Sequence, residues 1–163
     1  MHRPRSLLPA LSDEGFLQDV SISAGPTVTG AEPLQVAAAL IAREGRYLIT
    51  QRKAGVHLGG LWEFPGGKRE SNESLEDCLR RELREELGIE IAQPVLFRVI
   101  HHEYPEKAVA LHFFRCSIAS GLPRPLGCAD LRWVLPEELA QMPLPPADQP
   151  LVDVLCGERM NNP

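Results

Sequence analysis

Residues 67–89 read GKRESNESLEDCLRRELREELGI and place three glutamates, Glu82, Glu85 and Glu86, within five positions of the chain. Like charges four residues apart weaken a helix by about 0.2–0.5 kcal/mol. An unfavourable local arrangement of charges that no neighbouring residue compensates points to a functional site rather than to a structural element. A hard divalent cation with oxygen ligands is the natural compensation for such a group of carboxylates.

The same stretch predicts a helix over about residues 75–86. Ser74 suits the N-cap position, and Gly88 suits the C-terminal stop. At about 100° per residue, Glu82 and Glu86 fall on the arc that also carries the apolar side chains, namely Leu75, Cys78, Leu79 and Leu83. The alternative interpretation, a solvated acidic face, would place the acids opposite the leucines.

The run resembles the signature of Nudix hydrolases at every specified position. That signature reads Gly, five residues, Glu, seven residues, Arg-Glu, an aliphatic residue, one residue, Glu-Glu, one residue, Gly and an aliphatic residue. The preceding residues 62–68, WEFPGGK, resemble the entry to this signature in the MutT-type branch. The likeness continues more weakly from about residue 34 to 155. It implies an α/β fold, the Nudix α/β/α sandwich with a mixed β-sheet.

The resemblance also implies a metal site and a set of catalytic residues. The cofactor would be Mg²⁺, with Mn²⁺ as a possible substitute, because hard cations of this kind prefer oxygen ligands. The implied metal ligands are the carbonyl of Gly66 with Glu82, Glu85 and Glu86. The implied catalytic residues are these three glutamates with Arg81, which would orient Glu73 rather than touch the substrate.

Further residues are candidates for binding the substrate. Arg52 and Lys68 would offset phosphate charge, although either could simply be a solvated surface cation. Glu63 and Phe64 belong to the signature's entry segment, and Phe64, like Trp62, could stack on a base or fill the core. Asp148, in the segment PPADQP at residues 145–150, resembles the residue that contacts the purine edge in the MutT-type branch, where Asn is common. Its alternative role is the N-cap of a last helix.

The chain departs from part of the family pattern. Some members carry an additional metal-binding Glu in the loop before the strand at Leu131, where this chain has Leu126 or Gly127. The general base is therefore open, with Glu85 or Glu103 as substitutes. Adjacent residues on a strand face opposite sides, so the pair His101-His102 is not expected to bind a metal jointly. His57, in the loop before Trp62, either lines the substrate pocket or lies on the surface.

Composition agrees with a single soluble enzyme domain. The chain has 163 residues, 44% of them hydrophobic and 24% charged, and its net charge is −5. The negative charge argues against stable nucleic-acid binding, and no apolar run approaches the length of a membrane span. The four cysteines form no CxxC pair and indicate reduced thiols, two of them buried. We expect a cytoplasmic protein, a monomer or a homodimer, with no membrane partner.

Two segments divide the chain. Residues 1–33 indicate a weakly anchored arm, or an extra edge strand around Phe16–Ile22. Residues 34–160 form the predicted Nudix domain. Within this domain we expect strands at 35–41, 46–51, 94–104, 108–117 and 131–135, and helices at 75–86, 136–141 and 147–159.

Three functions follow as hypotheses. The first is a Mg²⁺-dependent nucleoside triphosphate diphosphohydrolase that releases a nucleoside monophosphate and pyrophosphate, of the 8-oxo-dGTP type that sanitises the nucleotide pool. The second is a pyrophosphatase for nucleotide sugars or other nucleoside diphosphate derivatives. The third is a non-catalytic, MutT-like lesion-binding module, of the kind that ends some adenine glycosylases. It ranks last because such modules usually lose the acidic residues that are intact in this chain.

Overall fold

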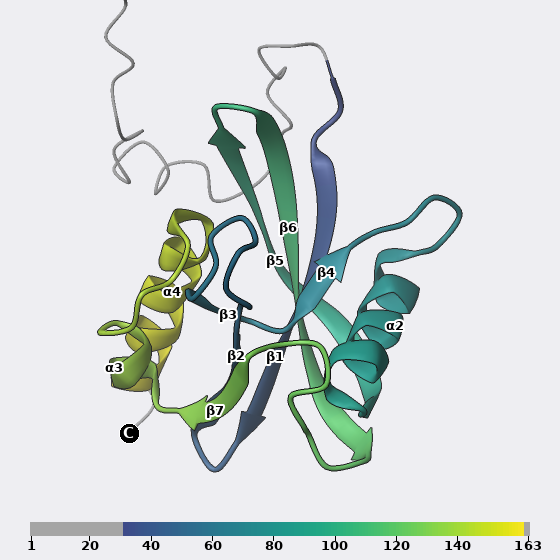
Figure 1. Cartoon of the computed structure of the whole chain (residues 1–163). Coiled ribbons are helices and arrows are strands. Elements are labelled where there is room, and N and C mark those ends of the chain that lie inside the picture. The colour runs from purple at the N-terminus through teal and green to yellow at the C-terminus, as the bar shows by residue number, and fades with distance from the viewer. Residues whose placement is uncertain (1–30, 162–163) are drawn as a thin grey trace, which may run out of the picture.

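The computed structural model describes residues 31–161. A mixed seven-stranded sheet is covered on one face by helix α2 and on the other by the C-terminal helices (Figure 1). The strands are β1 (Leu34–Arg43), β2 (Arg46–Gln51), β3 (Trp62–Glu63), β4 (Gly66–Lys68), β5 (Glu90–Tyr104), β6 (Lys107–Ser120) and β7 (Asp130–Val134). The helices are α2 (Leu75–Leu87), α3 (Pro136–Leu139), the 3₁₀ turn η1 (Pro146–Asp148) and α4 (Gln149–Met160).

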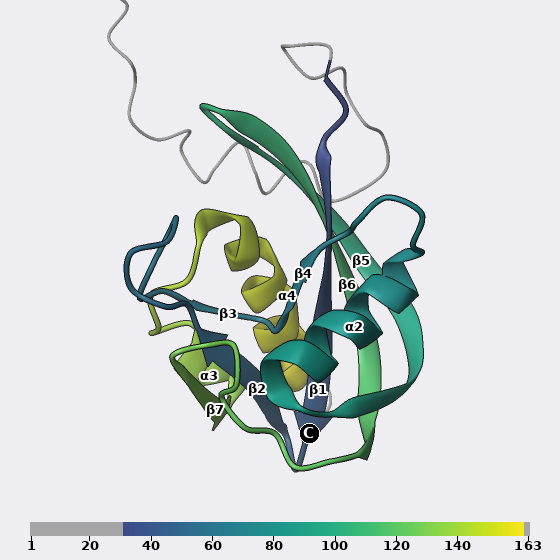
Figure 2. The same cartoon turned by 45° about the vertical axis from the view of Figure 1, so that its right-hand side comes forward.

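Strand β1 is the axis of the sheet. The strand order is β3-β2-β1-β6-β5, with β4 paired to β1 and β7 paired to β2. The β1–β6 pair is parallel, and every other pair is antiparallel. Strands β4 and β2 pair with different stretches of β1, β4 at residues 36–38 and β2 at residues 42–43. Figure 2 shows the long β5–β6 hairpin rising above helices α2 and α4.

Alternate residues of β1 serve two cores, as the period of a strand requires. Ala38 and Leu40 belong to the core beneath α4, whereas Ala37, Ala39 and Ile41 belong to the core beneath α2. The run of alanines keeps β1 narrow on both faces. This strand therefore reads as a continuous apolar run rather than an alternation, as strands buried on both sides do.

Helix α2 begins and ends where local signals predict. The Ser74 side chain accepts a hydrogen bond from the backbone N–H of Asp77 at 3.0 Å. Gly88 has left-handed backbone angles at the C-terminal end, and its N–H donates to the carbonyl of Arg84 at 3.0 Å. The buried residues of α2 are Cys78, Leu79, Leu83 and Leu87. The predicted helix at 75–86 is thus confirmed, with one more residue.

The other elements largely agree with the sequence prediction, and the differences have physical causes. Strand β5 starts at Glu90 rather than Pro94, because Pro94 lies within a register shift on an edge strand, where a proline is tolerated. The last helix starts at Gln149, after a 3₁₀ turn, and α3 ends at Leu139. The two-residue β3 and three-residue β4 were not separately predicted.

Two further expectations concern the cysteines and the membrane. Of the four free cysteines, only Cys78 is buried and the other three are half-buried, so the prediction of two buried thiols is wrong by one. Within residues 31–161, no helix is long and apolar enough to cross a membrane. The predicted arm at 1–33, apart from its last three residues, and the alternative strand at Phe16–Ile22 lie outside the described residues.

Candidate active site

Arg81 of α2 joins the acidic helix to the loop before it. Its guanidinium binds Glu73 through Nη2 at 2.7 Å and Nε at 3.1 Å. Nη1 donates to Glu82 at 2.9 Å and to Glu85 at 3.4 Å, and Nη2 also donates to the Lys68 carbonyl at 3.2 Å. These bonds hold the pKa of Glu73 down to about 2. The predicted contact between Arg81 and Glu73 is therefore present, and Arg81 also orients a second glutamate.

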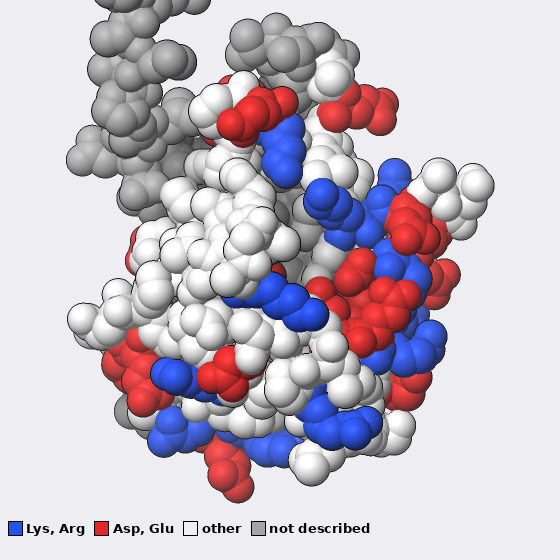
Figure 3. Space-filling model, viewed as in Figure 1, with Lys and Arg blue, Asp and Glu red and all other residues white. Residues whose placement is uncertain are grey.

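Two of the three clustered glutamates are partly withdrawn from solvent. Burial raises the pKa of Glu82 despite its hydrogen bond with Arg81. Burial, with the charges of Glu82 and Glu63, raises the pKa of Glu86 to about 8. Glu85 is the exposed member, with 60% of its side chain accessible. Figure 3 shows acidic side chains gathered over α2, with basic side chains beside them.

Two glycines of β4 bring the backbone close to these acids. A Cβ on Gly67 would collide with the carboxylate of Glu82. A Cβ on Gly66 would overlap the carbonyl oxygen of Ala37 and lie 2.8 Å from the Cα of Ala38. The Gly-Gly pair is therefore required by close packing between β1 on one side and α2 on the other.

The donor set fits a hard divalent cation in chemical type. Carboxylate and carbonyl oxygens are the ligands that Mg²⁺ prefers. The pKa of Glu86 is raised first by burial and then by the negative charges of Glu82 and Glu63 beside it. In residues 31–161, no three His, Cys, Asp or Glu side chains already converge in a metal-binding arrangement. Arg81 holds Glu82 and contacts Glu85, so these carboxylates would have to turn from the arginine to bind a cation.

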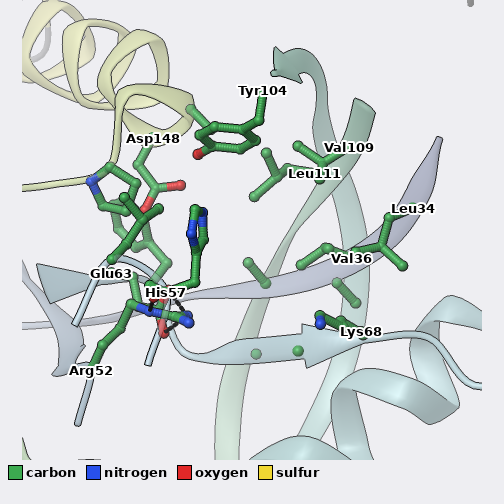
Figure 4. Close-up of a pocket in the computed structure, with 18 of the residues that line it drawn as sticks. Leu34, Val36, Arg52, His57, Glu63, Lys68, Tyr104, Val109, Leu111 and Asp148 are labelled. Carbon is green, nitrogen blue, oxygen red and sulfur yellow. Dashed lines mark hydrogen bonds and ion pairs between the residues drawn. The ribbon is translucent and has the colours of Figure 1, made fainter. Parts of the chain in front are cut away.

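A pocket opens beside β4. Its wall includes Gly66, Gly67 and Lys68, and its far end holds Asp148 together with Glu63 (Figure 4). Gly67 thus lines the pocket and also abuts Glu82 of the acidic helix. The pocket and the carboxylates consequently share one strand, and the candidate phosphate and base regions are continuous.

Asp148 is buried, with 4% of its surface exposed, and it points into the pocket. It occupies the N-cap position of α4, but its side chain makes no capping hydrogen bond. Burial and the charge of Glu63 raise its pKa well above the ordinary value. The structure therefore brings Asp148 to the pocket and gives its carboxyl group no part in capping the helix.

Arg52 organises the polar end of the pocket. Its Nη1 donates to both carboxylate oxygens of Glu63 at 3.1 Å, and its Nε donates to the His57 carbonyl at 2.8 Å. Despite this ion pair, burial raises the pKa of Glu63. Arg52 thus ties the loop at residues 53–61 to β3, a role that the sequence did not indicate. Lys68, also in the pocket wall, forms no ion pair with any residue in the range 31–161.

Several pocket residues escaped the sequence analysis. Tyr104, at the end of β5, packs edge to face with His57 at 5.6 Å between ring centroids. Lys107 begins β6 on the same side. An aliphatic wall comes from the parallel β1–β6 pair, namely Leu34, Val36, Val109 and Leu111. The register of β1 against β6 carried no sequence signal, but the apolar residues at alternate positions of both strands were visible.

The ring-bearing candidates lie in different environments. His57 lines the pocket. Phe64 does so too, while its ring packs edge to face on Phe113 in the core at 5.9 Å. Trp62 belongs to the same core and lies under Arg132 rather than in the pocket wall.

The loop before β7 and the paired histidines also have clear positions. Gly127 packs on Glu86, since a Cβ there would lie 3.2 Å from the Glu86 Cγ, and its N–H donates to the Glu86 carbonyl at 3.0 Å. Glu103 is exposed and is not part of the pocket wall. His102 is buried, whereas its neighbour His101 is half-buried, in agreement with opposite faces of β5.

The chain is similar to known proteins in both sequence and fold. A family model described as NUDIX domain matches residues 36–154. A CTP pyrophosphohydrolase of Escherichia coli (strain K12) is 39% identical over 130 residues, covering 80% of this chain and 96% of the relative. An 8-oxo-dGTP diphosphatase of Haemophilus influenzae is 35% identical over 129 residues, covering 78% of this chain and 95% of the relative. The crystal structure of a MutT NUDIX hydrolase from Burkholderia pseudomallei superposes with a TM-score of 0.69 at 29% identity, covering 76% of this chain and 98% of the other.

These likenesses extend over the sheet, α2 and the C-terminal helices, and the acidic residues of α2 lie inside the matched range. The chain belongs to the NUDIX domain family, as a hydrolase of the MutT type.

Proposed function

We propose that the protein is a Mg²⁺-dependent nucleoside triphosphate diphosphohydrolase that converts a nucleoside triphosphate and water into a nucleoside monophosphate and pyrophosphate. The single observation that carries this proposal is the shared position of Gly67. This residue lines the pocket and lies against Glu82 of the acidic helix. A base held near Asp148 would then extend its phosphates along β4 toward the carboxylates.

The residues divide the chemical work between them. A bound divalent cation lowers the pKa of water and offsets charge on the phosphates, and Glu82, Glu85, Glu86 and the Gly66 carbonyl are the groups proposed to hold it. Lys68 adds a positive charge in the wall beside β4. Arg81 positions Glu82 and Glu73 and does not itself line the pocket. Glu85, which is exposed, is the candidate to accept a proton from the attacking water.

The proposed preferred substrate is an oxidised purine nucleotide of the 8-oxo-dGTP type. It is supported by the position of Asp148 in the pocket and by the name of the Haemophilus influenzae relative. Cytidine triphosphate is a second candidate, favoured by the name of the Escherichia coli relative, which is a CTP pyrophosphohydrolase. No residue of the pocket favours a nucleotide sugar, and the intact acidic cluster argues against a non-catalytic module.

The test is a product-resolved hydrolysis screen over 8-oxo-dGTP, dGTP, dATP, CTP and a nucleotide sugar. We expect a monophosphate and pyrophosphate in the presence of Mg²⁺, and no turnover after chelation. Glu86→Gln should lower kcat by at least about a hundredfold, the scale of losing electrostatic stabilisation of a transition state. Glu106→Gln, on the exposed β5–β6 turn, is a matched control that should turn over like the wild type. Release of a diphosphate and inorganic phosphate, or normal turnover of Glu86→Gln, would contradict the proposal.

A further inference from the structure

The side chain of Asp148 is an unpaired polar group in an otherwise packed wall. Only 4% of the residue is exposed, and its carboxyl group points into the pocket between Tyr104 and Glu63 (Figure 4). Within residues 31–161, no side-chain hydrogen bond or ion pair is made by this carboxyl, while the backbone N–H of Asp148 donates to the Pro145 carbonyl at 3.0 Å. A buried polar group without a partner in the free protein is suited to meet one on a ligand.

The groups around Asp148 disfavour a negative charge there. Glu63 on β3 faces it as a second carboxyl, and the positive charge of Arg52 is shared with both oxygens of Glu63. Tyr104 on β5 stays a neutral hydroxyl, since burial, as the largest cause, raises its pKa to about 12. His57, on the loop at residues 53–61, is a further titratable residue that lines this pocket. Burial and Glu63 accordingly raise the pKa of Asp148 well above its ordinary range.

We propose, building on the nucleotide hydrolase function above, that Asp148 meets the base as a neutral carboxylic acid, with one donor and one acceptor, and that the pocket therefore accepts cytosine nucleotides besides the purines proposed above. The Watson–Crick edge of cytosine offers the N3 acceptor beside the N4 amino donor. A neutral acid pairs with both atoms: its hydroxyl donates to N3 and its carbonyl oxygen accepts from N4–H. An ionised carboxylate, which only accepts, would face the lone pair of N3 and repel it.

Guanine would form different hydrogen bonds with the ionised and with the neutral form of Asp148. An ionised carboxylate would accept from N1–H and from the N2 amino group together. A neutral acid would instead donate to O6 and accept from N1–H, leaving the amino group unused. Hypoxanthine has the same O6 and N1–H but lacks the amino group. The ratio of affinities for GMP and IMP therefore reports which state of Asp148 binds the base.

The first experiment measures dissociation constants of CMP, GMP and IMP by calorimetry, with chelator and without metal, near neutral pH. We expect CMP to bind, and GMP and IMP to agree within about threefold, since no hydrogen bond distinguishes them. Asp148→Asn should keep CMP affinity within about threefold, because an amide also presents one donor and one acceptor. Asp148→Ala should weaken CMP at least about tenfold, the cost of leaving buried partners unmet. GMP binding more than tenfold tighter than IMP, or CMP binding unaffected by Asp148→Ala, would overturn the inference.

The second experiment reads the carboxyl group itself. With ¹³C-labelled aspartate, the Asp148 carboxyl carbon should show the chemical shift of a protonated acid at neutral pH. Glu63→Gln removes the facing carboxyl and should lower the pH at which this carbon titrates, whereas Glu103→Gln, on the exposed side of β5, should leave it unchanged. A carboxyl shift that shows Asp148 to be ionised at neutral pH would contradict the inference. Because binding is measured without metal, a protein that binds CMP but hydrolyses no triphosphate would instead contradict the proposed function alone.

Discussion

At the scale of single residues, Arg81 shows how one side chain organises several acids. Its guanidinium contacts Glu73, Glu82 and Glu85, and its planar fork suits two-point bonds to a carboxylate. The sequence predicted its partner Glu73 because the resemblance supplies the spacing. It could not indicate the contact with the Lys68 carbonyl, which depends on how β4 approaches α2.

Replacing Arg81 should impair catalysis without removing any group that touches the substrate. Arg81→Ala is expected to lower kcat about a hundredfold, since small misplacements of positioned groups cost this much, while KM changes little. Arg81→Lys should recover only part of the loss, because an ammonium cannot reproduce the two bonds to Glu73. Steady-state kinetics provides the measurement. The control is Arg80→Ala on the same helix, whose ion pair with Asp77 is long, at 3.6 Å. Equal activity of Arg81→Ala and Arg80→Ala would remove Arg81 from its proposed role.

Substitution by alanine is expected to have opposite effects on stability at two of the glycines. Gly66→Ala forces a Cβ into the Ala37 carbonyl and the Cα of Ala38, so the paired strands must separate. We expect a loss of stability of about 1–3 kcal/mol, as for overpacking elsewhere, together with loss of activity. Gly157→Ala in α4 meets nothing within 4 Å and should stabilise the protein by roughly 0.5–1 kcal/mol. Urea unfolding of both variants provides the comparison. Equal stabilities would show that β4 yields to the added methyl group.

At the scale of elements, the structure could be predicted where it depends on residues close together in the sequence, and not where it depends on pairing between separate segments. The ends of α2 could be predicted to within a residue because the cap at Ser74 and the stop at Gly88 are local signals. Strands β3 and β4 were not predicted as two separate strands because each is too short to show a sequence pattern. They exist through pairing with β2 and β1, which lie far away in the chain. The aliphatic pocket wall depends in the same way on the parallel register of β1 with β6.

The N-cap of α2 offers a test at this scale. Ser74→Ala removes the acceptor for the Asp77 N–H and should cost about 1 kcal/mol of stability. Ser74→Asp should retain stability, because it caps the helix and also places a negative charge at the helix N-terminus. Because the acids of α2 lie in its later turns, we expect turnover of the folded protein to be nearly unchanged. Thermal unfolding and kcat together check this. A large fall in kcat with little fall in stability would mean that the first turn takes part in the site.

At the scale of the whole molecule, the site is assembled where the two cores meet. The acids come from α2 on one face of the sheet, and Asp148 comes from the start of α4 on the other. Strands β3 and β4 pass between these faces and carry Glu63, Gly66 and Gly67. The sequence could suggest each group, but only the folded sheet determines that the acids and Asp148 open on one pocket.

This arrangement makes stability depend on pH in two opposite directions. Arg81 lowers the pKa of Glu73 to about 2, so the folded state favours its charged form. The contribution of Glu73 is therefore complete above about pH 4.5 and is lost as pH falls toward 2. Asp148 behaves in reverse, because its pKa is raised in the fold. Above the ordinary Asp range, near pH 4, the folded state binds more protons than the unfolded chain, and stability falls as pH rises.

Asp148→Asn should abolish the second of these trends. An amide does not ionise, so the stability of the variant relative to wild type should increase from about pH 4 upward, and level off above the folded pKa of Asp148. Unfolding free energies of both proteins from urea titrations between about pH 4 and 8.5, with chelator present, give this difference directly. Asp153→Asn, at an exposed position of α4, is the matched control and should track the wild type across the range. If the difference for Asp148→Asn instead stays constant with pH, Asp148 has the same affinity for its proton in the folded and unfolded states. Asp148 would then ionise as readily in the folded protein as in the unfolded chain, and its burial beside Glu63 would have no net effect on its pKa.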